Sequence, residues 1–180
     1  MVMQNTKELY TRMSRRWDRR FLSLAREISS WSKDPSTQVG AVVVNDDRRV
    51  LATGYNGFPR GIVDKKSRLE NKEEKYRYMV HAEMNCIYNA ADAGVSLRGA
   101  TLYIWGLPVC SECAKGVISS GITRIVMPKS NKYPEKWIDS FAHSSAMFDE
   151  AEVTYEFRSW DKKGGQNDSS SQRDSTRENT

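Results

Sequence analysis

Four residues in two short segments of the 180-residue chain have the side chains of a catalytic metal centre. His81, and Cys110 with Cys113, offer one imidazole and two thiolates, which are typical ligands of tetrahedral Zn²⁺. Three protein ligands leave a fourth position for water, and this open position distinguishes a catalytic zinc from a structural one. Glu83 lies two residues after His81, where a carboxylate can exchange protons with that water. The residue types therefore predict a zinc-activated water with an adjacent proton carrier.

Each of the two segments is expected to open a helix. Apolar residues recur at helical spacing after each one, namely Met84, Ile87, Tyr88 and Ala91 in the first and Ala114, Val117 and Ile118 in the second. The positive end of a helix dipole favours thiolate over thiol and so favours metal binding. A lone C-x-x-C also fits redox pairs and half of many zinc fingers, so the combination of the two segments is the stronger signal.

A structural zinc site and a redox dithiol are the alternatives for this cluster. A structural site needs a fourth Cys or His in register, and Cys86, five positions after His81, is more than one helical turn away. His143 lies off the apolar stripe of its expected helix and is interpreted as a surface residue. A non-catalytic zinc module is a further alternative, but such a module has no use for Glu83.

The composition favours an intracellular enzyme with an anionic ligand. The net charge is +5, from 28 basic and 23 acidic residues, which fits a nucleotide phosphate or a nucleic acid, although no Lys/Arg block indicates nucleic acid by itself. Of three cysteines, two are assigned as ligands, which leaves no disulfide pair and indicates a reducing compartment. Neither a membrane-spanning run nor a signal peptide is recognisable. A cytoplasmic location and no membrane partner are expected.

The order of the expected elements indicates one α/β domain. An amphipathic helix, a β-hairpin, and then alternating helices and strands follow one another along the chain. The expected helices span 17–30, 81–93, 110–121 and 135–150, and the expected strands span 38–44, 49–53, 101–105, 123–127 and 153–157. This pattern predicts a three-layer α/β/α sandwich with a mixed five-stranded sheet, helices on both faces and right-handed parallel connections.

Two polar termini and one charged insert lie outside this pattern. Residues 1–16 are expected to form a polar N-terminal arm, and residues 161–180 contain no apolar side chain and are expected to be disordered. The zinc-binding domain is therefore placed at residues 17–160. The charged insert between residues 62 and 80 is expected to hold a short helix and to cover one edge of the site, and a solvated surface segment is the alternative.

Longer motifs make the chain similar to the cytidine-deaminase superfamily, and within it most similar to the deoxycytidylate (dCMP) deaminases. The superfamily signature combines H-x-E with P-C-x-x-C. Further similar motifs are Ser-Lys-Asp-Pro-Ser-Thr-Gln-Val-Gly-Ala at 32–41, Gly-Tyr-Asn-Gly at 54–57, Tyr-Met-Val-His-Ala-Glu-Met-Asn at 78–85, Cys-Ala-Lys at 113–115 and Gly-Ile-Thr-Arg at 121–124. The resemblance covers about residues 17–157 and leaves out both termini.

The resemblance implies zinc-dependent hydrolytic deamination of dCMP to dUMP with release of ammonia, a reaction that feeds thymidylate synthesis. It implies that His81, Cys110 and Cys113 bind one zinc ion per subunit and that Glu83 is the catalytic proton carrier. Because such enzymes are commonly homohexamers activated by dCTP and inhibited by dTTP, the same behaviour is expected here. The loop at residues 54–57 and the charged insert are the expected places for this control.

The resemblance also implies four substrate contacts. Asn56, which from spacing alone fits an ordinary Asn-Gly turn, would contact the sugar, and Ala82 would form part of the base pocket. Lys33 and Tyr133, the latter following Lys132 in a Lys-Tyr pair, would lie near the phosphate.

The cysteine loop departs from the family pattern, and other substrates remain open. Val109 separates Pro108 from Cys110, where the family usually has Pro directly before the first Cys, so the details of the base pocket are uncertain. Trp105 and Trp137 have no expected role. The same residues also fit a deaminase of dCTP or of deoxycytidine. A tRNA adenosine deaminase uses the same metal site, but the long insert before His81 argues against it, and no nucleic-acid partner is expected.

Overall fold

The computed structural model of the chain describes residues 2–130 and 133–159. The expected disordered tail at 161–180 and Lys132 of the Lys-Tyr pair lie outside the described residues. Among the described helices, none is both long enough and apolar enough to cross a membrane.

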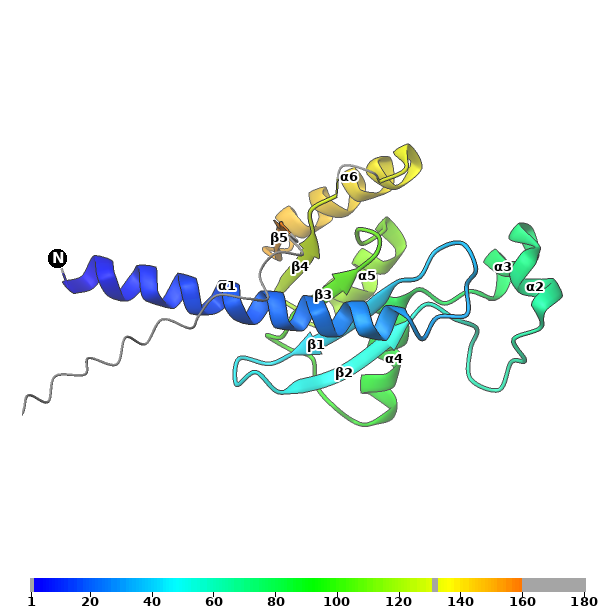
Figure 1. Ribbon diagram of the computed structural model, residues 1–180, viewed down its shortest axis with the longest axis horizontal. Helices are drawn as coiled ribbons and strands as arrows, with labels where there is room; N and C mark the ends of the chain where they lie inside the picture. The colour runs from blue at the N-terminus through cyan, green and yellow to red at the C-terminus, as the bar shows by residue number, and fades with distance from the viewer. Residues whose placement is uncertain (1, 131–132, 160–180) are drawn as a thin grey trace, which may run out of the picture.

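The described chain alternates between helices and strands in the predicted order (Figure 1). The helices are α1 (Val2–Ser29), α2 (Lys66–Glu70), α3 (Lys72–Tyr78), α4 (Ala82–Asp92), α5 (Ser111–Ser119) and α6 (Glu135–Glu150). The strands are β1 (Gly40–Val44), β2 (Val50–Tyr55), β3 (Thr101–Trp105), β4 (Arg124–Pro128) and β5 (Thr154–Arg158). The charged insert folds into two short helices, α2 and α3, where one was expected.

The five strands form one mixed sheet in the order β2-β1-β3-β4-β5. β1 pairs antiparallel with both β2 and β3, whereas β3, β4 and β5 are parallel to one another. The predicted fold class is therefore confirmed. β3 ends directly before the loop that leads to Cys110 and α5.

Helices cover both faces of the sheet and enclose two apolar clusters. α1 packs on one face, where Phe21, Leu22, Ala25 and Ile28 meet Val42, Val44, Tyr103 and Val126. α4, α5 and α6 pack on the other face, where their buried residues meet Ala41, Val43, Leu102, Ile104, Ile125 and Met127. β1 is buried along its whole length, as expected of a central strand covered on both sides.

The first helix is longer than the sequence pattern predicted. It was expected from Trp17, but α1 begins at Val2 and includes most of the segment interpreted as a polar arm. No Gly or Pro lies between Val2 and Ser29, so nothing in the sequence interrupts the helix. The N-terminal half of α1 extends beyond the sheet (Figure 1).

Close packing of α4 on β2 depends on Gly54. A Cβ atom at Gly54 would lie 2.3 Å from the backbone N of Cys86 and 2.5 Å from the backbone O of Ala82. Because the helix backbone occupies this space, only glycine allows β2 to approach the first turn of α4 so closely. The first turn of α4 carries two of the predicted site residues, so this contact positions the site.

Candidate active site

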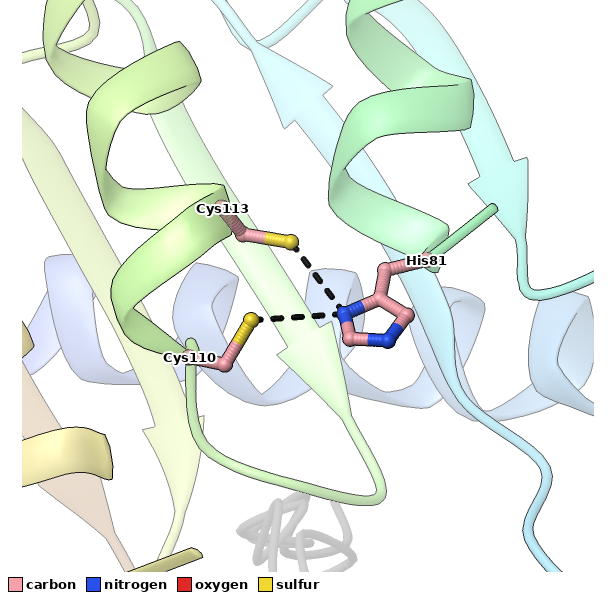
Figure 2. Close-up of side chains that lie close together, drawn as sticks. All are labelled: His81, Cys110 and Cys113. Carbon is pink, nitrogen blue, oxygen red and sulfur yellow. Dashed lines mark hydrogen bonds between the residues drawn. The ribbon is translucent and has the colours of Figure 1, made fainter. Parts of the chain in front are cut away.

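His81, Cys110 and Cys113 converge between the first turns of α4 and α5, as Figure 2 shows. His81 is the N-cap residue of α4, Cys110 is the N-cap residue of α5, and Cys113 lies in the first turn of α5. The Nδ1 atom of His81 lies 3.3 Å from Sγ of Cys110 and 3.4 Å from Sγ of Cys113. The prediction that both segments open helices is confirmed.

The three side chains fit a tetrahedral zinc ion. Their ligand atoms all lie within 4.8 Å of one another, and among the described residues Cys86 does not join this group. A sulfur and a nitrogen on one zinc ion, bound at about 2.3 Å and 2.0 Å, are separated by about 3.5 Å in a tetrahedron. The observed separations of 3.3 Å and 3.4 Å need only a small expansion to match it. Two thiolates and one imidazole are also the donors that zinc prefers.

The charges around the cluster favour a cation. Hydrogen bonds from Cys113 and His81, which outweigh burial, lower the pKa of Cys110 to about 4, so that this residue is a thiolate at neutral pH. The hydrogen bond with Cys110 raises the pKa of His81. Glu83 is only 4% exposed, and burial raises its pKa to about 7. A carboxyl group with this pKa is suited to both accept and donate a proton near neutral pH.

The additional Val109 is accommodated in the core. Val109 is fully buried, and its carbonyl oxygen accepts a 2.8 Å hydrogen bond from Oγ of Ser144 in α6. Pro108 and Cys110, on either side, both line the cavity described next. The longer cysteine loop therefore buries the side chain of Val109 in the core and keeps Pro108 and Cys110 at the cavity.

A cavity of about 400 Å³ opens above the metal cluster. His81, Ala82, Glu83, Leu107, Pro108 and Cys110 line it around the cluster, and Asp34, Ser36, Thr37, Val39 and Asn56 line a second side. Glu70, Lys72, Lys75, Tyr76 and Met79 line a third side, and Pro134 and Trp137 complete the lining. The prediction that the charged insert covers one edge of the site is confirmed, since α2 and α3 supply that third side. The volume suits a small-molecule ligand.

The cavity includes two of the four predicted substrate contacts. Ala82 is fully buried and lines the cavity beside Glu83. Asn56 also lines the cavity, but its amide is already engaged. Oδ1 accepts a 2.8 Å bond from the backbone N–H of Val39, and Nδ2 donates a 2.9 Å bond to the carbonyl of Thr37.

The other two predicted contacts, Lys33 and Tyr133, are not among the residues lining the cavity. The side chain of Lys33 is 68% exposed and pairs with Asp64 at 2.6 Å. The hydroxyl of Tyr133 donates a 2.5 Å bond to the carbonyl of Pro128. Contact of either residue with a phosphate stays a prediction, and each would have to leave its present partner to make it.

Sequence reasoning missed two features of the cavity wall. Trp137 lines the cavity with its ring centroid 6.2 Å from that of His81, at an interplanar angle of 65°. Lys75 lies in a highly charged run that resembles a solvated surface, yet its side chain is only 5% exposed and pairs with Asp34. The turn residues after Asp34 were the available signal that this carboxylate is held inside the fold, because an Asp at a turn often binds backbone N–H groups nearby.

Comparison with known proteins assigns the family. The family model for the cytidine and deoxycytidylate deaminase zinc-binding region matches residues 15–129. The human deoxycytidylate deaminase is 36% identical over 144 residues, which cover 77% of this chain and 78% of the human protein. A probable deoxycytidylate deaminase of Drosophila melanogaster is 40% identical over 149 residues, 77% of this chain and 70% of the fly protein. The chain belongs to the cytidine and deoxycytidylate deaminase family, and it is a hydrolytic deaminase.

A solved structure supports the fold independently. The crystal structure of the dCMP deaminase from cyanophage S-TIM5 in complex with dCMP and dUMP matches with a TM-score of 0.60. It is 23% identical and covers 77% of this chain and 93% of the phage chain. The same five-stranded arrangement is thus found at low sequence identity.

Proposed function

We propose that this chain deaminates dCMP to dUMP with the zinc ligands and Glu83 at the floor of the cavity. The observation that carries the proposal is the convergence of His81, Cys110 and Cys113 beside a cavity of about 400 Å³ that His81, Cys110 and the buried Glu83 line. The relatives named deoxycytidylate deaminase support dCMP over other cytosine compounds.

Hydrolytic deamination exchanges the C4 amino group of cytosine for the oxygen of water. His81, Cys110 and Cys113 would hold a zinc ion, which when bound would lower the pKa of a water molecule and so supply an effective nucleophile at neutral pH. Glu83 accepts a proton from the attacking water and donates it to N3 of the ring. The same carboxyl group then carries the second proton to the amino group, which leaves as ammonia. Burial of Glu83 excludes bulk water from these transfers.

The phosphate contact is the least defined part of the site. Lys33 and Tyr133 remain proposed contacts, and Lys72, which is exposed and lines the cavity, is a further cation within reach of its mouth. An exposed ammonium at a cavity mouth attracts a phosphate without a large desolvation cost.

Regulation by dCTP and dTTP, and assembly as a homohexamer, are also proposed. A second cavity, of about 560 Å³, lies between α4 and the segment at residues 54–57, which is the end of β2 and the two residues after it. Tyr55, Gly57, Arg60 and Asn85 line this cavity. Asn56 of the same segment lines the first cavity, so a ligand in the second cavity would act on a segment shared by both. Stimulation of activity by dCTP, reversal by dTTP, and a sedimentation mass of six subunits would test these proposals. A cytoplasmic location stays a prediction, and it agrees with the reduced state that the thiolate ligands require.

The test of the function is an absorbance assay with dCMP, dCTP, deoxycytidine and CMP in parallel, each with and without added dCTP. Among the four compounds, only dCMP is expected to be converted rapidly. Faster conversion of dCTP or deoxycytidine would keep the mechanism and replace the substrate. No conversion of any of the four by zinc-loaded protein would contradict the proposal, and deamination of tRNA adenosine would then be the alternative to measure.

A further inference from the structure

A buried ion pair lies on the cavity wall and takes no part in the zinc chemistry. Asp34 follows α1 in the turn that leads to β1, and Lys75 lies in α3 of the insert. Their side chains are 6% and 5% exposed, and Nζ of Lys75 lies 2.9 Å from Oδ1 of Asp34. Both residues line the cavity together with Ser36.

The two carboxylate oxygens of Asp34 differ in their surroundings. Oδ1 accepts hydrogen bonds from Lys75 Nζ, from the backbone N–H of Ser36 at 2.8 Å and from that of Thr37 at 3.2 Å. Oδ2 accepts no hydrogen bond from the described residues, and it is not one of the fully buried polar atoms that lack a partner there. It is therefore accessible from the cavity that Asp34 lines, where a hydrogen-bond donor of a ligand can reach it.

The unpaired oxygen belongs to the same wall as Asn56. Nδ2 of Asn56 donates a hydrogen bond to the carbonyl oxygen of Thr37, and the backbone N–H of Thr37 donates one to Oδ1 of Asp34. Lys75 also donates a 3.0 Å bond to Oγ of Ser36, so it holds Asp34 and the turn together. Asp34 is therefore held by Lys75 and by the turn that follows it. This is the preorganisation that a specific ligand contact needs.

The chemistry of a cytosine nucleotide leaves one partner for this oxygen. A deoxycytidine monophosphate offers two kinds of hydrogen-bond donor, the C4 amino group and the 3′-hydroxyl. The amino group is the leaving group and must lie at the zinc cluster and Glu83. The phosphate carries only acceptors when it is fully ionised, so it offers no hydrogen to this oxygen.

We propose that Asp34 accepts a hydrogen bond from the 3′-hydroxyl of the substrate sugar, with Lys75 and Ser36 positioning its carboxylate. This inference rests on the proposed function, since it names how the same site holds its nucleotide. It adds a charged acceptor to Asn56, whose amide is largely occupied by Thr37 and Val39.

The test compares dCMP with 2′,3′-dideoxycytidine monophosphate, which lacks only the 3′-hydroxyl. Hydrogen bonds to charged groups are strong, so wild-type kcat/KM is expected to fall about 10- to 100-fold on the dideoxy substrate. Asp34→Asn is expected to lose about the same factor on dCMP. On the dideoxy substrate it should differ from wild type by about twofold or less, because the interaction is already absent there.

Two further variants separate recognition from folding. Asp34→Asn with Lys75→Gln removes both charges of the pair, and it should show the same loss of discrimination even where the single variant folds poorly. Glu73→Gln makes a comparable carboxylate-to-amide change in α3 at an exposed pair with Arg77, and it should keep the wild-type ratio of the two substrates.

Several outcomes would overturn the inference. A wild type that uses both substrates within about twofold has no 3′-hydroxyl contact to explain. An Asp34→Asn protein that keeps the wild-type ratio shows that Asp34 acts only in folding. If the wild type deaminates dCMP and one of these two results is obtained, this inference is overturned and the proposed function stands. A wild type that deaminates neither nucleotide overturns the proposed function, and this inference with it.

Discussion

At the scale of single residues, Glu83 has an environment that suits the proton-transfer role proposed for it. It lies at the start of α4, where a carboxylate is favoured by the helix dipole, yet it is buried beside two thiol groups. Burial is the largest influence on its pKa, which rises to about 7. A residue selected only for stability at this position would be apolar or small, as its neighbour Ala82 is.

Glu83→Gln is expected to abolish turnover without loss of the metal. The amide has nearly the same shape but cannot carry a proton, so kcat should fall about 10²- to 10⁴-fold. Metal analysis should still find one zinc ion per chain, because Glu83 is not among the three converging ligands. Activity within about tenfold of wild type would show that another group moves the proton.

At the scale of elements, the site depends on how closely α4 approaches the sheet. His81 and Glu83 lie in the first turn of α4, and Gly54 of β2 lies directly against the backbone of that turn. The amides of Asn85 and Asn89 in α4 also donate 2.8 Å and 2.9 Å bonds to the carbonyls of Tyr55 and Thr53. These contacts fix both the distance and the register of the helix.

Gly54→Ala is expected to destabilise the fold by about 3 kcal/mol, because its methyl group meets backbone atoms that cannot move aside independently. Gly57→Ala is the matched control in the same segment. A Cβ atom there would meet only the ring of Tyr55 at 3.5 Å, which is an ordinary contact, so a change within about 1 kcal/mol is expected. Urea denaturation of both variants provides the measurement, and equal effects would show that α4 can shift away from β2.

The attachment of α3 to the turn before β1 should depend on pH. Burial raises the pKa of Asp34, but the hydrogen bonds from Lys75, Ser36 and Thr37 outweigh it and leave the pKa below its ordinary value. A depressed carboxyl pKa stabilises the fold above the unfolded value of about 4, and this contribution is lost as pH falls through the folded pKa.

The difference in unfolding free energy between wild type and Asp34→Asn should therefore shrink as pH falls from about 6 to about 3. Urea denaturation at a series of pH values gives this difference directly. Glu73→Gln, at an exposed pair, should differ little from wild type throughout. If the difference in unfolding free energy between wild type and Asp34→Asn stayed constant over the pH series, the charge of Asp34 would be excluded as its source.

At the scale of the whole molecule, the fold and the cluster of His81, Cys110 and Cys113 were largely predictable from the sequence. Apolar runs and helical spacing located the described strands and the helices that position these three residues, because such patterns record burial directly. The partners of long polar side chains were not predictable, since tertiary contacts decide them. Lys33 pairs with Asp64 and Tyr133 with Pro128, and their contact with a phosphate stays a prediction. Lys75 was missed for the same reason: its partner Asp34 is 41 residues away.

One further polar cluster links elements that the sequence does not associate. Asp18 of α1 is 2% exposed and accepts a 2.9 Å bond from the hydroxyl of Tyr103 in β3. Arg124 of β4 donates to both of its carboxylate oxygens, at 2.9 Å and 2.8 Å, and Arg158 of β5 lies 3.4 Å away. A single carboxylate thus connects the helix on one face to three neighbouring strands.

Asp18→Asn is expected to destabilise the whole fold by about 2 kcal/mol, because Arg124 and Arg158 then lose a buried carboxylate and keep Glu156, which pairs with both, as their remaining partner. Asp47→Asn is the matched control. Asp47 forms an exposed pair with Arg49 at 4.0 Å, so its replacement should change stability by about 0.5 kcal/mol or less. Urea denaturation followed both by far-ultraviolet circular dichroism and by tryptophan fluorescence tests whether one transition is retained. If Asp18→Asn unfolded α1 in a separate, earlier transition, the cluster would be a local attachment of that helix, and the sheet with its zinc ligands would be stable without it.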